Sequence, residues 1–273
     1  EMFARSVDQA QKQGINLMLK HEAINIDFDN KLVKIRSLEE KKEFDLDYDK
    51  LVIATGAYPL SVLEDKKNLE NQYTITKPYE VDELKSKLST AKNIVVIGGG
   101  FIGLEVAEQL AHLGKNVSLL QRSEMVMRRI FDPEISNLLH EALVENGVDL
   151  HLNTPIKDYQ VENGKIKQVI TEKGSFPADI VIESLGFRPN TAFIDDPRLK
   201  KIANGAIVID EYGKTSIEDV YAAGDCATVY NRQRDYFYSA LATYANKMGR
   251  LIGENIVSDK QKPYIGALAS SVI

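Results

Sequence analysis

The chain has 273 residues, which is enough for two compact units of ordinary size. Hydrophobic residues make up 44% and charged residues 27%, and these globular values exclude a disordered acidic tail or a fibrous repeat. The net charge of -6 gives no broad attraction to nucleic acid or anionic lipid, and no apolar run approaches the roughly 18 residues of a membrane helix. We therefore expect neither nucleic acid nor a membrane as a partner.

The cysteine and histidine content argues against disulfide-bonded and metal-bound structures. Cys226 is the single cysteine, which excludes an internal disulfide, a C-x-x-C redox pair and a thiolate zinc cage. The four histidines are scattered and form no H-E-x-x-H pattern. The composition predicts no metal site and a reducing, cytoplasmic setting. The chain opens at Glu1 without an initiator methionine or a signal pattern, as expected for a piece of a longer protein.

In chain order, the first 90 residues predict a mixture of small elements. We expect a polar helix over residues 5–13, two strands over 16–29 and 32–35, and a buried strand over 51–54 that ends in the turn Thr55-Gly56-Ala57. Residues 60–75 are polar and predict a loop. Apolar residues at helical spacing predict a helix over residues 81–88.

The strongest pattern begins at residue 93. A buried strand over 93–97 runs directly into the glycines of a G-x-G-x-x-G motif and a helix that ends before Gly114. A strand over 117–120 follows, then a helix that Asp132-Pro133 opens and Gly147 ends. The apolar stripe expected on that helix consists of Ile135, Leu138, Leu139, Leu143 and Val144.

The rest of this region predicts a third strand over 148–152, a hairpin over 156–161 and 166–171, and a returning strand over 179–183. The order is β-α-β-α-β with a β-meander as the crossover. Short strands are expected after residue 205, a further segment over 216–225, a helix over 241–257 and a strand over 264–273.

The glycine motif predicts a dinucleotide site because it follows a buried strand and opens a helix inside a βαβ unit. Gly98 permits the tight turn, Gly100 permits close approach of a pyrophosphate, and Gly103 permits close packing of helix and strand. The helix start offers free N–H groups and a positive dipole end to an anion. The alternative is a purely structural turn, in which three glycines would weaken the helix without a ligand.

The end of the second strand indicates which dinucleotide is bound. An acidic residue there would bind the ribose 2′-hydroxyl, but position 121 is Gln. Arg122 and Arg128 follow, with Arg129 beside the latter, and could place two guanidinium groups around a 2′-phosphate. The alternative is that they are solvated surface arginines. The pattern favours NADPH over NADH.

In the helix that follows the glycine motif, Glu105 lies near the expected mouth of the site. It could accept a hydrogen bond from the carboxamide of a nicotinamide, or it could simply cap the helix start, where negative charge is favoured.

Three further segments resemble one family when taken with the glycine motif: residues 48–56 (YDKLVIATG), 184–190 (SLGFRPN) and 220–226 (VYAAGDC). The chain resembles the pyridine nucleotide-disulfide oxidoreductase flavoproteins over nearly its whole length. Residues 241–250 (LATYANKMGR) resemble the branch that holds coenzyme A-disulfide reductase, NADH oxidase and NADH peroxidase.

The resemblance implies an α/β fold of two Rossmann-like domains, each with a β-meander. Residues 80–200 would form an NAD(P)-binding domain inserted into an incomplete FAD-binding domain of residues 1–79 and 201–262, and residues 263–273 would begin a C-terminal dimerisation domain. Phe101, Ile102 and Gly186 join the expected nucleotide site. The positions that the resemblance implies for FAD are Ala23, Thr55, Gly56, Gly224, Asp225, Leu241 and Ala242.

The physical character of the FAD positions agrees with that role, since a carboxylate accepts hydrogen bonds from hydroxyls and a helix start favours an anionic reduced ring. For Asp225 alone an N-cap would be the alternative. The chain has Ala240 where a proline commonly precedes the leucine in this branch. The catalytic cysteine of the family lies upstream of this chain, so Cys226 is expected to be a small packed residue and no catalytic residue is assigned.

The expected function is an FAD-dependent NAD(P)H oxidoreductase that passes hydride from nicotinamide to flavin, and then electrons to a small-molecule disulfide such as that of coenzyme A, to oxygen or to peroxide. A ferredoxin or rubredoxin reductase type is the second enzyme hypothesis. The third is an NAD(P)-binding module without FAD. The resemblance implies a homodimer for the full-length protein.

Overall fold

The computed structural model describes residues 6–231 and 235–266. The chain divides into a first unit of residues 1–58 and 187–272 and a second unit of residues 59–186, and each is described by itself. This division differs from the expected limits of 80 and 200. Residues 59–79 belong with the second unit, and residues 187–200 belong with the first.

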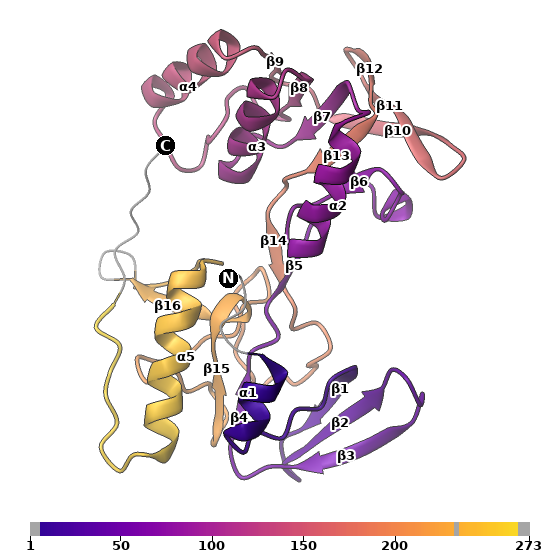
Figure 1. Ribbon diagram of the computed structural model, residues 1–273. Coiled ribbons are helices and arrows are strands. Elements are labelled where there is room, and N and C mark those ends of the chain that lie inside the picture. Colours follow the sequence, from indigo (N-terminus) through magenta and orange to yellow (C-terminus); the bar gives the residue numbers. More distant parts are fainter. Residues whose placement is uncertain (1–5, 232–234, 267–273) are drawn as a thin grey trace. The chain divides into compact units, whose positions relative to one another are not determined.

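The second unit is built on a five-stranded parallel sheet (Figure 1). Its strands, in spatial order, are β6 (Gln72–Tyr73), β13 (Ile180–Glu183), β7 (Asn93–Ile97), β8 (Asn116–Leu120) and β9 (Val148–His151). Because β6 pairs with β13, residues 72–73 belong to this sheet rather than to the first unit.

Side chains alternate between two buried faces of this sheet, as expected for parallel strands covered on both sides. Ile94 and Val96 of β7 pack on the side of the helices α2 (Pro78–Leu88), α3 (Phe101–His112) and α4 (Pro133–Glu145). Val95 and Ile97 pack on the side of an antiparallel meander of β10 (Ile156–Glu162), β11 (Lys165–Thr171) and β12 (Gly174–Pro177). The β-α-β-α-β order with a meander crossover is confirmed.

The buried face of α4 differs from the expected stripe. Ile135, Leu138 and Val144 are 45%, 61% and 59% exposed. Leu143 is buried and Leu139 packs partly buried against the core, as expected. Ser136 is also buried, and its hydroxyl donates to the carbonyl of Val126 at 2.9 Å. A hydrogen bond from a polar side chain of α4 to the neighbouring loop therefore helps to decide which face of the helix is buried. The pattern of apolar residues in the sequence does not show this bond.

The first unit contains α1 (Val7–Lys12), which Ser6 and Gln9 cap reciprocally. A second antiparallel meander follows: β1 (His21–Asp27), β2 (Leu32–Ser37) and β3 (Glu43–Asp47). β3 was not predicted, although its apolar residues alternate with acidic ones as in a strand; all five of its residues are exposed. The expected α/β fold, with a β-meander in each unit, is confirmed.

The remaining elements of the first unit are short pairs and one long helix. The parallel pair is β4 (Leu51–Ile53) with β15 (Val220–Ala222), and the others are β5 (Ala57–Pro59) with β14 (Phe187–Pro189) and β16 (Thr228–Asn231) with β17 (Asp235–Tyr238). Helix α5 (Ala242–Val257) packs Tyr244, Met248 and Ile252 into the core. Ile194 and Leu199 join the same core, which explains why residues 187–200 belong here.

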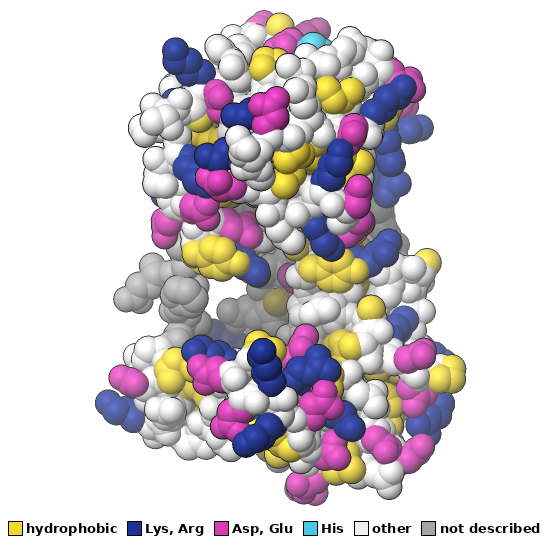
Figure 2. Space-filling view, turned by 90° about the vertical axis from the view of Figure 1, so that its right-hand side faces the viewer, with side chains coloured by type: hydrophobic (Ala, Val, Ile, Leu, Met, Phe, Trp, Pro, Cys, Tyr) yellow, Lys and Arg dark blue, Asp and Glu magenta, His cyan; other side chains and the backbone are white. Residues whose placement is uncertain are grey.

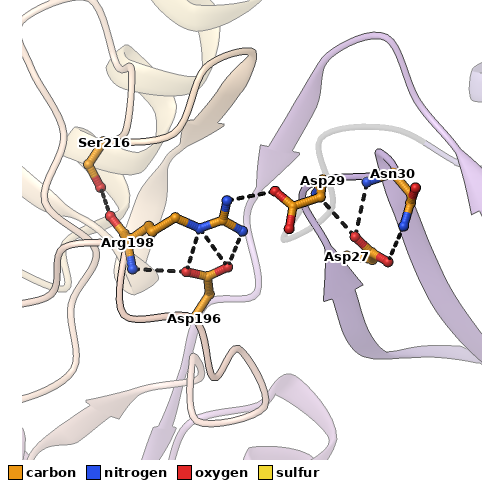
Figure 3. Close-up of polar contacts among 6 residues, drawn as sticks. All are labelled: Asp27, Asp29, Asn30, Asp196, Arg198 and Ser216. Carbon is orange, nitrogen blue, oxygen red and sulfur yellow. Dashed lines mark hydrogen bonds and ion pairs between the residues drawn. The ribbon is translucent and has the colours of Figure 1, made fainter.

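An ion-pair network fastens the β1–β2 turn to a distant loop of the first unit (Figure 3). The Arg198 guanidinium donates to both carboxylate oxygens of Asp196 and to Asp29 at 2.6 Å. Asp27 accepts hydrogen bonds from the N–H groups of Asp29 and Asn30 at 3.1 and 3.0 Å. The network holds the pKa of Asp196 below its ordinary value, with the Arg198 hydrogen bond as the main cause.

Acidic and basic side chains are interspersed on the face drawn in Figure 2. No helix within the described residues has the length and apolar character needed to cross a membrane. The expected strand over 264–273 lies mostly outside the described residues, and its described part, residues 264–266, has no regular secondary structure.

Candidate functional site

The glycine loop, residues 98–103, lies where β7 ends and α3 begins, at the carboxyl edge of the parallel sheet (Figure 1). Gly98 has φ +106°, and a Cβ there would lie 2.4 Å from the carbonyl oxygen of Ser184. A Cβ at Gly103 would lie 1.9 Å from the carbonyl oxygen of Gly98. These two glycines are required by the fold itself.

Gly100 has a different environment. A Cβ at this position would meet no atom within 4 Å, and its φ of -96° is open to any residue. No neighbouring group therefore explains a glycine here, whereas a ligand that approaches the backbone closely would. Among the three expected glycines, Gly100 is the one whose role the fold does not account for.

The start of α3 carries free hydrogen-bond donors. Gly100 is the N-cap and supplies no capping side chain, and the first helical hydrogen bond runs from the N–H of Leu104 to the carbonyl of Gly100 at 3.0 Å. The N–H groups of Phe101, Ile102 and Gly103 precede this bond and have no intrahelical acceptor. Together with the helix dipole they form an anion-binding position.

Residues 121–131, here called the clamp loop, hold the glycine loop from one side. The Gly99 N–H donates to Oε1 of Gln121 at 2.9 Å, and the N–H of Met127 donates to the Gly99 carbonyl at 2.8 Å. Val126 packs against Gly99, where a Cβ would lie 2.7 Å from its Cγ1. Both polar groups of the Gly99 residue are thus fixed without a ligand.

Helix α4 supports the clamp loop. Besides the Ser136 hydrogen bond, Nε2 of His140 accepts the N–H of Val126 at 3.1 Å. Burial lowers the pKa of His140, which favours the neutral ring that this acceptor role requires. Ser136 and His140 of α4 therefore support the glycine loop indirectly, through the clamp loop.

The expected 2′-phosphate residues lie on the clamp loop but differ in their pairing. Arg128 is paired with Glu124, with Nε and Oε1 3.0 Å apart. Arg122 and Arg129 are exposed, and neither has an ion-pair partner among the described residues. Glu105 is likewise exposed on α3 and unpaired within that part of the chain. Arg122 and Arg129 are therefore the guanidinium groups of this loop that are available to a ligand.

Gly186 follows β13 at the same edge of the sheet. It has φ +87°, and its carbonyl accepts the N–H of Leu60 at 3.0 Å. The neighbouring Ser184 N–H donates to Ile97 at 2.8 Å, which ties the 184–186 turn to the base of the glycine loop. The second unit therefore brings together its expected residues, which are Gly98, Gly100, Phe101, Ile102, Gly103, Gln121 and Gly186.

In the first unit, two expected segments meet beyond the β4–β15 pair. The Ala223 N–H donates to the Ile53 carbonyl at 3.0 Å, which sets the turn at Gly224 beside the chain that leads to Thr55. The Thr55 hydroxyl donates to the Asn190 carbonyl at 2.6 Å, and the Asn190 N–H donates to Gly56 at 2.9 Å. Thr55 and Gly56 thus hold the segment that directly follows β14 (Phe187–Pro189).

Asp225 lies on the 3-10 turn η2 (Gly224–Cys226), directly against α5. A Cβ at Gly224 would lie 3.5 Å from Cβ of Ala245. The Asp225 carboxylate has no hydrogen-bond partner among the described residues, and burial raises its pKa. It does not cap a helix, so the N-cap alternative is not what the structure shows.

Tyr238, at the end of β17, carries a buried hydroxyl without a hydrogen-bond partner in the described part of the chain. Burial, with a contribution from Asp225 and Cys226, raises its pKa to about 12. A buried polar atom of this kind is rare in a folded protein and indicates a missing partner. An unpaired carboxylate and an unpaired hydroxyl fit a ligand rich in hydroxyl and carbonyl groups, as FAD is.

The start of α5 is exposed and uncapped. Leu241 is the N-cap with no capping side chain, and the N–H groups of Tyr244 and Ala245 donate to its carbonyl at 3.0 and 3.1 Å. The N–H of Ala242 precedes these bonds and has no intrahelical acceptor. Ala23 lies in β1 at an irregularity of the β1–β2 register and packs partly against the core.

Cys226 is fully buried, with its sulfur 3.3 Å from the carbonyl oxygens of Ile53 and Ala223. Burial raises the pKa of this thiol, which opposes formation of a nucleophilic thiolate. These observations support the expected packing role.

Sequence reasoning missed several residues that shape the site: Gly99, Ser123, Met127, Ser136, His140 and Tyr238. The uninterrupted run of three glycines was a signal for Gly99, because a clash with Val126 forbids a side chain there. The others show no signal in the sequence. Met127, Ser136 and His140 bond backbone groups that lie elsewhere in the chain. Ser123 acts through the Gln121 amide, and Tyr238 has no partner among the described residues.

Residues 3–249 match the family described as pyridine nucleotide-disulphide oxidoreductase. An NAD(P)H coenzyme A polysulfide/persulfide reductase from Pyrococcus horikoshii is 35% identical over 267 residues, which cover 96% of this chain and 58% of that protein.

Two solved structures share the fold over 97% of this chain. A water-forming NADH oxidase from Lactobacillus brevis, bound to NADH, matches with a TM-score of 0.89 and 30% identity, over 58% of its own chain. An engineered variant of it, a water-forming NADPH oxidase bound to NADPH, matches with a TM-score of 0.87 and 31% identity, over 59% of its chain. The chain spans about three fifths of the length of the curated relatives it matches. It belongs to the pyridine nucleotide-disulphide oxidoreductase family.

Proposed function

We propose that the second unit binds NAD(P)H at the glycine loop and that the first unit supplies part of an FAD site. The whole protein is then an NAD(P)H-dependent flavoprotein oxidoreductase. The observation that carries this proposal is the glycine loop itself, which is held in place without a ligand while its Gly100 side stays open.

The chain's own residues bind the diphosphate of the nucleotide. The N–H groups of Phe101, Ile102 and Gly103 donate to it, and the positive end of α3 favours its charge. Phe101 is oriented by an edge-to-face contact with Phe131, with ring centroids 6.4 Å apart. We assign Phe101, Ile102 and Glu105 to positioning the nicotinamide, with Glu105 as an acceptor for its carboxamide.

NADPH is the preferred nucleotide in this proposal. In the engineered NADPH oxidase, an aspartate is replaced by alanine, the next two positions become arginine and serine, and a further arginine is introduced five positions beyond that serine. This chain has an uncharged Gln121, then Arg122 and Ser123, and Arg128 five positions beyond Ser123. The same residue types at the same spacing support a 2′-phosphate site on the clamp loop.

On the flavin side, Asp225 accepts hydrogen bonds from ligand hydroxyls, Tyr238 supplies a buried donor, and the start of α5 favours negative charge. Bound FAD supplies the hydride acceptor and passes electrons onward. The residues around these positions exclude water: Ala223 and Cys226 are buried beside Asp225.

The terminal acceptor belongs to the whole protein. The names of the relatives point to oxygen and to a persulfide or polysulfide of coenzyme A, and peroxide or a disulfide is chemically close to these. We propose a small-molecule acceptor of this group. Nothing in the geometry specifically favours a ferredoxin or rubredoxin reductase. The homodimer and the cytoplasmic location stay predictions.

Calorimetric titration of the purified chain with NADPH and NADH tests the nucleotide site. We expect NADPH to bind about tenfold or more tightly, because hydrogen bonds to charged groups contribute about 1.5–3 kcal/mol. Arg122→Ala should remove most of this preference and leave NADH binding unchanged. A chain that binds neither nucleotide, or that prefers NADH, would contradict the proposal.

Absorbance of the same preparation tests the flavin site. A chain that carries flavin bands supports the FAD assignment for this piece. A colourless chain that still binds NADPH supports the alternative in which this piece is a nucleotide-binding module and only the longer protein holds FAD.

A further inference from the structure

We propose that Gln121 is a positioning residue that sets the glycine loop for the diphosphate, and that it does not read the ribose of the nucleotide. The inference rests on the nucleotide binding proposed above. It departs from the expectation for this position, where the end of the second strand decides between the 2′-hydroxyl and the 2′-phosphate.

The first step concerns the peptide that joins Gly98 and Gly99. No peptide bond in the described residues is cis, so the carbonyl of Gly98 and the N–H of Gly99 point in opposite directions. Gln121 accepts that N–H at 2.9 Å. The Gly98 carbonyl is thereby turned toward Gly103, where only 1.9 Å separates it from the position of a Cβ. The Gln121 hydrogen bond therefore sets how closely α3 approaches the loop.

The second step concerns the peptide that joins Gly99 and Gly100. Its carbonyl accepts the Met127 N–H at 2.8 Å, so the Gly100 N–H points away from the clamp loop. That N–H has no acceptor among the described residues, and the space beside Gly100 is open. With both peptides held, the donors at the start of α3 are oriented before any ligand arrives.

The third step is that each polar group of the Gln121 side chain already has a partner within the protein. Its Nε2 donates to the Ser123 hydroxyl at 2.6 Å and lies 3.2 Å from the Met125 carbonyl, while Oε1 is taken by Gly99. Its backbone N–H and carbonyl bond to His151 and Thr154 at 2.8 and 2.9 Å. A side chain used in this way stabilises the loop and leaves the ribose to its neighbours on the clamp loop.

Positioning of the glycine loop by Gln121 and recognition of the ribose by Gln121 predict different binding patterns. If Gln121 sets the loop, its loss lowers the population of the binding-competent loop and weakens NADH and NADPH by the same factor. If it reads the ribose, its loss changes the ratio of the two affinities. Arg122→Ala supplies the comparison, because it should weaken only NADPH.

The test uses calorimetric titration of the chain with both nucleotides. Gln121→Met has a similar length and no acceptor, and we expect it to weaken both nucleotides about tenfold, with their ratio unchanged within about twofold. Gln121→Glu keeps an acceptor for Gly99, so NADH binding should return to within about threefold of the parent. A Gln121→Met ratio that shifts while NADH affinity is retained would overturn the inference, as would parent affinity for both nucleotides.

A measurement without nucleotide separates this inference from the proposed function. Hydrogen exchange followed by NMR should show a faster Gly99 amide in Gln121→Met and a parent-like one in Gln121→Glu, since only the former removes the acceptor. If the Gly99 amide exchanges at the parent rate in Gln121→Met, the positioning role of Gln121 is refuted even when the parent binds nucleotide. A parent chain that binds neither nucleotide refutes the proposed function and this role for Gln121 with it.

Discussion

Two glycines of the same loop are expected to respond differently to an added methyl group: one substitution should lower stability, and the other should weaken nucleotide binding. Gly98→Ala places a Cβ 2.4 Å from the Ser184 carbonyl oxygen at a residue with φ +106°. An unfavourable backbone conformation costs about 1–3 kcal/mol and overpacking about as much again, so the free energy of unfolding of the second unit should fall by roughly 2–6 kcal/mol. The Ser184 carbonyl belongs to the backbone and cannot rotate away.

Gly100→Ala is the matched control, because its Cβ meets no atom within 4 Å and its φ is -96°. We expect its stability to stay within about 0.5 kcal/mol of the parent. Its methyl group would, however, occupy the space proposed for the diphosphate, so NADPH affinity should fall about tenfold or more.

Urea unfolding followed by circular dichroism measures both variants, since the chain has no tryptophan for fluorescence. Hydrogen exchange of peptides from residues 93–120 assigns the loss to the second unit. The reasoning would be refuted if the two variants lost equal stability, or if Gly100→Ala bound NADPH as tightly as the parent.

Three further changes probe the charged and polar groups of the two candidate sites. Glu124→Gln releases Arg128 from its ion pair and should strengthen NADPH binding severalfold without affecting NADH, as titration of both nucleotides would show; equal effects on both would contradict the proposed 2′-phosphate site. Asp225→Asn removes a carboxylate whose pKa burial raises above its ordinary 3.8. Such a group stabilises the folded state fully below its unfolded pKa, and this contribution is lost as the pH rises through the raised value. The flavin-free variant should therefore be more stable than the parent at pH 7 and similar to it near pH 3 in thermal unfolding, and a variant less stable at pH 7 would count against the burial. Tyr238→Phe removes an unpartnered buried hydroxyl, so it should leave the flavin-free chain equally or more stable and weaken FAD binding in the full-length protein, measured by flavin fluorescence; a clear loss of stability would mean that the hydroxyl has a partner.

Most of the second unit could be predicted from local patterns. The buried run at residues 93–97, the glycine motif and the stop at Gly114 each depend on neighbours within a few residues, and the observed strand and helix match them. The polar part of the buried face of α4 could not be predicted this way. Ser136 and His140 are not part of the apolar stripe, but both bond the backbone of Val126.

The residues of the candidate site could also be predicted only in part. Gly98 and Gly103 follow from the motif, and Arg122 and Arg128 follow from their position after the second strand. The pairing of Arg128 with Glu124 and the use of the Gln121 amide by Gly99, Ser123 and Met125 depend on how the clamp loop folds back. The roles of these two side chains were therefore not available from spacing.

The amino-acid sequence alone determined the family, the order of strands and helices, and the residue types that a nucleotide and a flavin require, because these depend on periodicity, turn residues and charge along a short stretch of chain. Only the tertiary structure decided which of those residues are still unpartnered. A hydrogen bond is satisfied by whatever group lies within about 3 Å in space. The Gln121 side-chain oxygen is paired with Gly99 from a different strand end, whereas Asp225 and Tyr238 have no partner among the described residues, and spacing along the chain shows neither outcome.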